Sequence, residues 1–274
     1  MATASKTGRE AKRIFSIVHD SFGEIRLQEN ETHGAFFGTS GRFLRFLQDI
    51  EKASLCDIPV LLLGESGSGK TSAARTIHSL SKRKSGEFFD VNVSAVSDGI
   101  IESELFGSCA GAFTDSMNRD GYFSKANGGS VFLDEIGDAS LAMQKKLLKV
   151  VECGEFRKVG SSDTEKTDVR FLFATNADLR AKMKSGEFRE DLFYRIAGAV
   201  IECPSLKEIR DDIPSFCDFH LKKSGCKKRL SSSALCALKE HDWPGNFRQL
   251  QNTLDRAVAF SEGDEIGESD IVIW

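Results

Sequence analysis

The apolar positions at the start of this 274-residue chain repeat with the period of an α-helix. Between residues 14 and 25, one helical face would carry Ile14, Ile17, Val18, Phe22 and Ile25. A second face follows Thr39 and Ser40, whose hydroxyl groups are suited to cap a helix. Its apolar positions are Phe43, Leu44, Phe46, Leu47 and Ile50. The pattern predicts a short amphipathic helix over 14–25 and a second helix directly after residue 40.

Strand-like runs, most of them apolar, replace this helical period from residue 59 onward. The runs cover residues 59–63, 88–93, 130–133, 169–174 and 199–203. Helical patterns lie between them, notably over 70–80 and 141–151. Apolar strands that alternate with helices are typical of a parallel sheet covered by helices on both faces. The sequence therefore predicts an α/β fold of three layers.

The strand-like runs stop at Pro204, where the character of the chain changes. Helical patterns then cover 213–223, 231–241 and 246–260, which predicts a small all-helical unit after the α/β unit. The basic run 222–229 lies where two of these helices are joined. We interpret it as a solvated loop in preference to a nucleic-acid contact.

The composition narrows the class of protein further. Apolar residues make up 40% and charged residues 28%, which excludes a disordered or fibrous chain. A net charge of −4 does not support nucleic-acid binding through bulk charge. The longest aliphatic stretch, Val60–Leu63, is too short for a membrane helix, and residues 1–13 lack the apolar region of a secretory signal. We therefore expect a cytoplasmic protein.

Seven cysteines are scattered along the chain without a CxxC pair. A disulfide framework is not expected in a chain without an export signal. A zinc site can be imagined from Cys217, His220, Cys226 and Cys236, but their spacing matches no common zinc motif. Buried or reduced thiols are the favoured interpretation.

A phosphate-binding loop is the first motif that carries chemistry. Residues 64–71 satisfy the pattern G-x-x-x-x-G-K-[ST], between a predicted strand and a predicted helix. Backbone N–H groups of the loop would close around phosphate oxygens, helped by the positive end of the following helix. Lys70 would reach the β- and γ-phosphates, and Thr71 would hold Mg²⁺. The cofactor-binding residues predicted here are Gly64, Glu65, Ser66, Gly67, Ser68, Gly69, Lys70 and Thr71.

Two carboxylates follow the predicted strand 130–133, at the sheet edge where parallel α/β folds bind ligands. Asp134 can hold Mg²⁺ through water, and Glu135 can polarise an attacking water as a general base. Together with the phosphate loop, this pair predicts an enzyme that hydrolyses ATP with Mg²⁺.

With both motifs in place, the chain resembles the AAA+ ATPase domain of bacterial enhancer-binding proteins, the activators of sigma-54 RNA polymerase. The resemblance runs from about Gly38 to Ser261. Besides the phosphate loop, it is carried by ESELFG (102–107), GAFTDS (111–116), ANGGSVFLDEIGD (126–138), QKKLLKVVECGEFRKVGS (144–161), FLFATN (171–176), FREDLFYR (188–195) and WPGNFRQL (243–250). It implies a P-loop NTPase with an N-terminal extension (1–37), an α/β nucleotide-binding domain (38–203) and a helical lid domain (204–274).

The resemblance also implies roles for individual residues. Asn176, at the end of a strand, would be sensor I and feel the γ-phosphate. Arg189 and Arg195 would be arginine fingers that reach the ATP of the neighbouring subunit. Arg248 would be sensor II, which brings the lid onto the nucleotide. Asn92 would hold the catalytic Glu135 in an inactive pose and form a switch with it.

The family works as a ring, usually a hexamer, and the resemblance implies a homo-oligomer here. ATP hydrolysis would move two loops, one of which is a hairpin near residues 155–168. The other loop holds Gly111, Ala112, Phe113 and Thr114. In the family this loop contacts sigma-54 and remodels the closed promoter complex, so the implied partner is sigma-54 RNA polymerase holoenzyme.

The partner loop departs from the family pattern. The family reads GAFTGA and this chain reads GAFTDS, so Asp115 and Ser116 replace glycine and alanine. The change removes access to positive φ and adds a charge. Activation through sigma-54 is the favoured hypothesis. The alternatives are a nucleotide-binding regulatory module and an AAA+ protein that remodels another partner. Residues 1–37 are too few for a receiver domain, and no DNA-binding helix-turn-helix is expected in the 14 or so residues after the last predicted helix.

Overall fold

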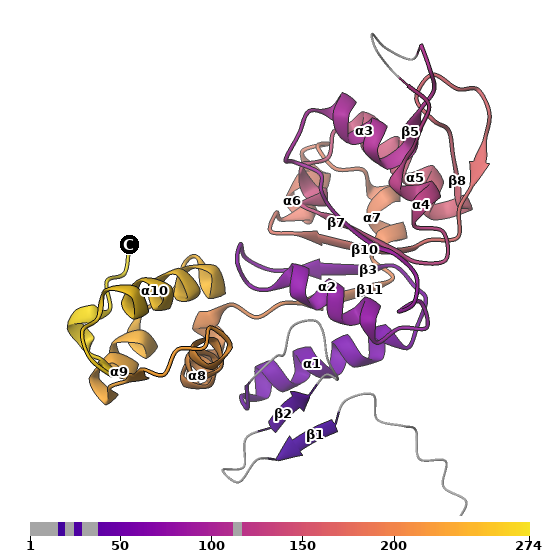
Figure 1. Ribbon diagram of the computed structural model, residues 1–274. Helices are drawn as coiled ribbons and strands as arrows, with labels where there is room; N and C mark the ends of the chain where they lie inside the picture. Colours follow the sequence, from indigo (N-terminus) through magenta and orange to yellow (C-terminus); the bar gives the residue numbers. More distant parts are fainter. Residues whose placement is uncertain (1–15, 20–24, 29–37, 112–116) are drawn as a thin grey trace, which may run out of the picture.

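The computed structural model describes residues 16–19, 25–28, 38–111 and 117–274. Its centre is a five-stranded sheet with the order β11-β3-β10-β7-β4, in which every neighbouring pair is parallel (Figure 1). The strands are β3 (Val60–Leu63), β4 (Phe88–Asn92), β7 (Ser130–Asp134), β10 (Arg170–Thr175) and β11 (Ala199–Glu202). All five coincide with the apolar runs of the sequence, so the α/β fold class is confirmed.

Helices cover both faces of this sheet and make three layers. One face packs against α1 (Gly41–Ser54) and α2 (Lys70–Ser79), and the other against α3 (Asp98–Phe106), α5 (Leu141–Cys153) and α7 (Glu190–Ile196). Because successive side chains of a strand point to opposite faces, Leu61 and Leu62 enter different core clusters. The short helices α4 (Tyr122–Lys125) and α6 (Leu179–Lys184) complete the unit.

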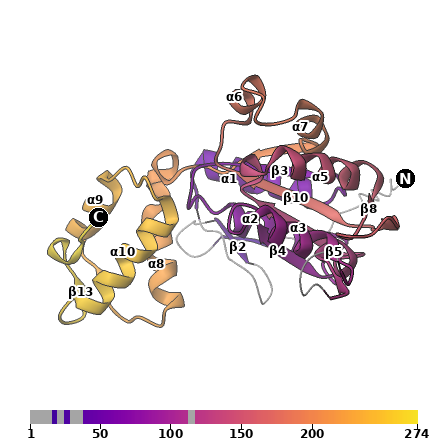
Figure 2. The ribbon, with the colours of Figure 1, turned by 90° about the horizontal axis from the view of Figure 1, so that it is seen from above.

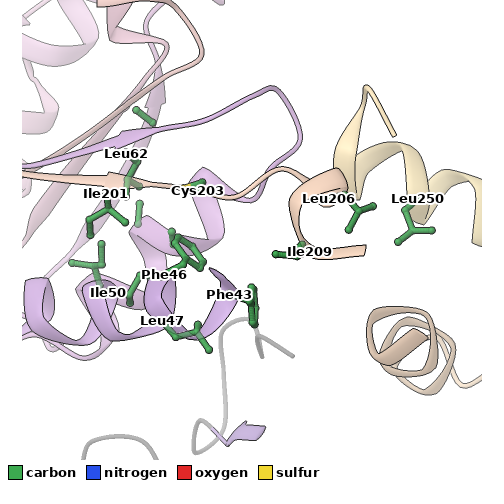
Figure 3. Close-up of a cluster of buried hydrophobic side chains, with 14 of the residues drawn as sticks. Phe43, Phe46, Leu47, Ile50, Leu62, Ile201, Cys203, Leu206, Ile209 and Leu250 are labelled. Atoms are coloured by element: carbon green, nitrogen blue, oxygen red, sulfur yellow. The ribbon is translucent and has the colours of Figure 1, made fainter. Parts of the chain in front are cut away.

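The helix expected after residue 40 is α1, and its start follows from a cap. The hydroxyl of Ser40 accepts a hydrogen bond from the backbone N–H of Phe43. Asp212, from the beginning of the lid, accepts hydrogen bonds from the N–H groups of Thr39 (2.6 Å) and Ser40 (3.0 Å). Figure 3 shows the core that α1 shares with the sheet and the lid: Phe43, Phe46, Leu47 and Ile50 on α1, and Leu206, Ile209 and Leu250 across the junction.

Phe132 provides a test of this core. It is fully buried on β7, with its ring centroid 6.4 Å from that of Phe88. Phe132→Ala should lower the free energy of unfolding by about 3–5 kcal/mol, because it deletes apolar contacts and leaves a cavity. Phe260→Ala is the matched control, since Phe260 is 74% exposed, and should change it by less than about 0.5 kcal/mol. Chemical denaturation measures both, and equal effects would contradict this description of the core.

The lid lies beside the α/β unit in both views (Figures 1 and 2). It contains the 3₁₀ turn η2 (Leu206–Asp212), the helices α8 (Ile213–Lys223), α9 (Ser232–Glu240) and α10 (Asn246–Phe260), and the turn η3 (Glu268–Asp270). The three predicted helices are confirmed. The prediction that strands stop at Pro204 is wrong in detail, because β12 (Arg229–Leu230) pairs in parallel with β13 (Glu265–Ile266). Two residues are too few to produce a recognisable period in the sequence.

The basic run joins α8 to β12, as expected for a connecting loop. Four of its charged side chains are exposed: Lys222, Lys223, Lys227 and Arg229. Lys228 instead turns inward, and its Nζ donates to the carbonyl oxygens of Val258 (3.0 Å) and Ser261 (2.7 Å) at the end of α10. This lysine therefore neutralises the negative end of a helix.

The amphipathic helix predicted over 14–25 is wrong where the structure describes those residues. β1 (Ser16–His19) pairs antiparallel with β2 (Ile25–Gln28), with Ser16 opposite Gln28 and His19 opposite Ile25. The β-branched residues Ile17, Val18 and Ile25 favour a strand, and a helix would have to include Gly23. Among the described residues, no helix has both the length and the apolar character that crossing a membrane requires.

Candidate functional site

The carboxyl ends of four neighbouring strands bring the predicted site residues to one edge of the sheet. The phosphate loop follows β3, Asp134 ends β7, and Asn176 follows β10. Asn92 ends β4 and lies opposite Asp134 in the β4–β7 register. Parallel strands end together at this edge, so groups far apart in the sequence meet there.

The phosphate loop is folded around the ammonium group of Lys70. Gly67 and Gly69 have positive φ values of 74° and 94°, which glycine adopts without strain, and Gly69 is the N-cap of α2. The Lys70 side chain is buried, and its Nζ donates to the carbonyl oxygens of Gly64 (2.9 Å) and Glu65 (3.2 Å). Thr71 lies in the first turn of α2. The cation and the helix N-terminus therefore face the same anion-binding loop.

Asp134 and Glu135 lie beside this cation. Burial, and then the charge of Glu135, raises the pKa of Asp134 above its usual range, although its Oδ1 accepts a hydrogen bond from the Glu135 N–H (3.0 Å). Glu135 has a left-handed backbone (φ 54°, ψ 43°), an uncommon conformation for a residue other than glycine. Its Oε1 is 3.9 Å from Lys70 Nζ. The Glu135 carboxylate therefore faces the Lys70 ammonium group, and the Asp134 carboxylate lies next to Glu135.

Asn176 contacts this pair, whereas Asn92 has other partners. The backbone N–H of Asn176 donates to Glu135 Oε2 (3.2 Å). Asn92 Oδ1 accepts hydrogen bonds from the N–H and the hydroxyl of Ser94, both at 2.9 Å. The Glu135 carboxylate is therefore held by the Asn176 segment, and the Asn92 side chain is hydrogen-bonded to Ser94.

The lid docks directly on the phosphate loop through the start of α10. Asn246 Nδ2 donates to Glu65 Oε2 (2.9 Å) and to the carbonyl of Ser66 (3.1 Å), and the N–H of Phe247 donates to the carbonyl of Gly67 (3.0 Å). Arg248 Nη1 is 3.5 Å from Ser66 Oγ, so the expected sensor II residue also lies at this loop.

The sequence predictions missed Asn246, which is fully buried and has a left-handed backbone (φ 50°). Asparagine tolerates that conformation better than most residues. The signal was therefore present in the Gly245–Asn246 step before a helix, but its partner loop lies about 180 residues earlier in the chain.

An apolar cavity of about 460 Å³ adjoins the phosphate loop, between α1, α2 and the lid. Its walls include Ser68 and Gly69 from the loop, together with Phe43, Phe46, Phe216, Phe247, Leu250 and Leu254. The rings of Phe216 and Phe247 have centroids 4.4 Å apart. The hydroxyl of Ser68 is buried without a hydrogen-bond partner among the described residues. An apolar space with a few polar groups at one end suits a flat heteroaromatic ring.

The two predicted finger arginines lie around α7. Arg189 is the N-cap of α7, and its guanidinium makes two hydrogen bonds to Asp191, at 3.0 and 2.6 Å. That contact lowers the pKa of the Asp191 carboxyl. Arg195 is exposed, and its Nη2 donates to the carbonyl of Glu152 (3.0 Å) at the end of α5. The described contacts of the two guanidinium groups are thus with Asp191 and Glu152, and not with Lys70 or Glu135.

The predicted partner loop emerges from a two-residue antiparallel pair, β5 (Gly107–Ser108) with β6 (Arg119–Asp120). Gly111 has a positive φ of 83°. The remaining predicted loop residues lie outside the described residues: Ala112, Phe113, Thr114, Asp115 and Ser116.

The hairpin expected near 155–168 is confirmed by the antiparallel pair β8 (Glu155–Phe156) and β9 (Glu165–Lys166). Lys158 in this hairpin lies 2.7 Å from Asp120 and 3.1 Å from Glu165, and Val159 forms a bridge with Ser108. The bases of the two loops are therefore joined.

No cluster of His, Cys, Asp or Glu suited to hold a metal ion occurs among the residues that the structure describes. Cys217 is buried in α8, where burial raises the pKa of its thiol to about 12. His220 Nε2 lies 2.6 Å from Asp255 Oδ1. Of the other two residues considered for zinc, Cys226 is half-buried and Cys236 is exposed.

Comparison with known proteins identifies the class to which this fold and site belong. Residues 36–202 match the family model of the sigma-54 interaction domain, and residues 207–272 match that of the AAA+ ATPase lid domain. The chain belongs to the sigma-54 interaction domain family of AAA+ ATPases.

Individual relatives are transcription regulators. The chain is 45% identical over 216 residues to the hydrogenase transcriptional regulatory protein HoxA of Cupriavidus necator, which covers 77% of this chain and 45% of HoxA. It is 39% identical over 240 residues to the transcriptional regulatory protein ZraR of Salmonella typhimurium, covering 85% of this chain and 54% of ZraR. The chain spans about half the length of the curated relatives it matches.

The fold is similar to that of NtrX from Brucella abortus. The crystal structure of NtrX in complex with ADP has a TM-score of 0.80 and 33% identity, and it covers 86% of this chain and 54% of NtrX. The NtrX complex with ATP has a TM-score of 0.79 and 31% identity, covering 87% of this chain and 56% of NtrX. The AAA+ fold with a helical lid is thereby confirmed.

Proposed function

We propose that this chain hydrolyses ATP within a homo-oligomeric ring, usually a hexamer in its family, and remodels sigma-54 RNA polymerase to activate transcription initiation. The observation that carries the proposal is the convergence of Lys70, Asp134, Glu135 and the Asn176 segment at one sheet edge. The family match and the NtrX complex with ATP support it. The proposed units are the extension 1–37, the nucleotide-binding domain 38–203 and the lid 204–274.

ATP fits this site in two parts. The phosphates would lie in the phosphate loop. There the Lys70 ammonium group now donates hydrogen bonds to the carbonyl oxygens of Gly64 and Glu65. The adenine would enter the apolar cavity next to Gly69, where the Ser68 hydroxyl has no hydrogen-bond partner in the part of the chain that the structure describes. The hydroxyl of Thr71 and the carboxylate of Asp134 are hard oxygen ligands of the kind that Mg²⁺ prefers. When bound there, Mg²⁺ supplies positive charge against the phosphate oxygens.

Different residues of the chain would carry out the remaining steps of ATP hydrolysis. Glu135 would accept a proton from the attacking water, and the Asn176 segment holds that carboxylate in place. Lys70 would transfer its hydrogen bonds from the loop carbonyl groups to phosphate oxygens. Arg248 would stabilise the closed lid over the nucleotide. Asn92 lies opposite Asp134 and would take hold of Glu135 in an inactive state.

The fingers explain why a ring would be needed. The guanidinium groups of Arg189 and Arg195 contact Asp191 and the Glu152 carbonyl, and not Lys70 or Glu135 of their own chain. In the proposed ring they would complete the site of the next subunit. Charge supplied in this way stabilises the transferring phosphoryl group. Hydrolysis would then depend on assembly.

The partner loop gives the test of sigma-54 engagement. Thr114→Ala should reduce capture of sigma-54 by about tenfold or more, as loss of a contact at the centre of an interface does, and leave ATP hydrolysis within about twofold. The loop base at β5–β6 is separate from the phosphate loop, so the two activities should be separable. Capture is measured with a transition-state nucleotide mimic trapped in the ring.

The double change Asp115→Gly with Ser116→Ala restores the family pattern and should strengthen that capture, because it removes a charge and returns a flexible glycine. Capture by neither the parent nor the restored loop would exclude the activator function. A regulatory module, or an AAA+ protein with a different partner, would then be the better account.

A further inference from the structure

Gln144 is a fully buried amide on α5 whose two ends are both hydrogen-bonded. Its Nε2 donates to the carbonyl oxygens of Ala139 (2.8 Å) and Glu187 (2.9 Å), and its Oε1 accepts from the backbone N–H of Arg189 (2.8 Å). Two carbonyl partners at one end and an N–H at the other are consistent with only one orientation of the amide. An aliphatic side chain of the same size would leave these three backbone groups without their partner.

The hydrogen-bond partners of Gln144 come from two segments. One belongs to the ATP site of the same chain, and the other carries the arginine proposed for the neighbouring site. Ala139 directly follows the turn Ile136–Asp138, which begins at Glu135 of the chain's own site. Glu187 and Arg189 lead into α7, and Arg189 is the finger proposed for the neighbouring site. One amide therefore spans the catalytic turn of one site and the arginine offered to another.

Lys182 on α6 links the same two segments from the other side. Its Nζ donates to the carbonyl of Gly137 (2.7 Å), and its own carbonyl accepts from the N–H groups of Glu187 (2.9 Å) and Phe188 (3.0 Å). The side chain of Phe188 is buried. The chain is therefore held closely up to Arg189, and Gln144 supplies the last bond before α7 begins.

We propose that Gln144 is the positioning residue of the Arg189 finger, holding the backbone of Arg189 in register with the turn that follows Glu135. The proposal rests on the proposed function, in which Arg189 acts on the neighbouring subunit. Arg189 has an extended backbone (φ −78°, ψ 132°). Its side chain begins at the Cα next to the N–H that Gln144 holds, so the position of the guanidinium group depends on that hydrogen bond. A misplacement of about 1 Å in a catalytic group can cost roughly 10²-fold in rate.

Mixed assemblies of the full chain test this proposal. Gln144→Leu should lower the turnover of ATP by about 10- to 100-fold and leave the dissociation constant for ATP within about threefold, because its own phosphate loop is intact. Mixed with Lys70→Ala subunits, which lack an ATP site and keep the finger, Gln144→Leu should regain turnover. Mixed with Arg189→Ala subunits, which lack the finger, it should regain none.

The opposite pattern would overturn the proposal. Rescue by Arg189→Ala and not by Lys70→Ala would mean that Gln144 acts on its own site through Ala139. Mixing Arg189→Ala with Lys70→Ala tests the proposed function separately, and no rescue in that pair would refute fingers acting between subunits. Gln48→Leu makes the same chemical change at an exposed position of α1 and should leave turnover unchanged.

A second variant guards against failure of the first to fold. Gln144→Met keeps the length of the side chain and should show the same pattern of rescue. If neither variant assembles as the parent does, the amide is required for folding itself, and the positioning role is refuted.

Discussion

Glu135→Gln should leave ATP bound and reduce its hydrolysis by about 10²–10⁴-fold, the usual contribution of a general base. The substitution preserves shape, and its amide oxygen can still accept the Asn176 N–H that now donates to Glu135 Oε2. An amide cannot take a proton from water, so the chemical step is lost while the site remains assembled. Phosphate release at saturating ATP and the binding of a fluorescent ATP analogue measure the two properties.

Two further variants, Lys70→Ala and Glu262→Gln, serve as controls for Glu135→Gln. Lys70→Ala should lose nucleotide binding, because the buried ammonium group is the positive charge at the centre of the loop. Glu262→Gln makes the same chemical change at an exposed position of the lid and should alter neither property. Unchanged hydrolysis by Glu135→Gln would mean that another group activates the water.

Arg195→Ala should lower turnover by about 10³-fold or more, the range found for arginine fingers, without weakening the binding of ATP to the same chain. Its described contact is with the Glu152 carbonyl and not with the phosphate loop. Arg45→Ala, which removes an exposed arginine from α1, is the matched control and should have little effect.

The same mechanism makes the activity of the parent depend on its concentration. Specific activity should rise steeply over the range in which subunits assemble, since each site would receive its fingers from a neighbour. Light scattering reports assembly while phosphate release reports turnover. A flat specific activity across the assembly range would contradict the assignment of Arg189 and Arg195 to the neighbouring site.

Much of the α/β unit was predictable because its signals are local. Buried parallel strands read as mostly apolar runs, and β3, β7, β10 and β11 coincide with such runs. β4 was also located from its apolar residues, although Asp90 and Asn92 interrupt its run. The phosphate loop is equally local, since the glycines that need positive φ, the lysine and the helix start lie within eight consecutive residues. The roles of Asn92, Asn176, Arg189, Arg195 and Arg248 came from the resemblance to the family, and they stay predictions.

The local signals failed where a segment is very short. The β1–β2 pair was mistaken for a helix, because apolar residues at spacings of three and four also occur by chance over twelve residues. The pair β12–β13 was missed because each strand has two residues. Pairing of short strands is determined by the partner strand, and a single segment carries no record of it.

By itself, the sequence determined the five strands of the central sheet, the phosphate loop and the carboxylate pair, since contiguous residues encode each of them. Tertiary structure alone decided the cavity between α1, α2, α8 and α10, the docking of Asn246 on a loop about 180 residues away, and the three bonds of Gln144. A glutamine in an amphipathic helix gives no sign of its partners. Those partners become adjacent only when the sheet and its helices pack, and most polar groups buried by that packing are hydrogen-bonded.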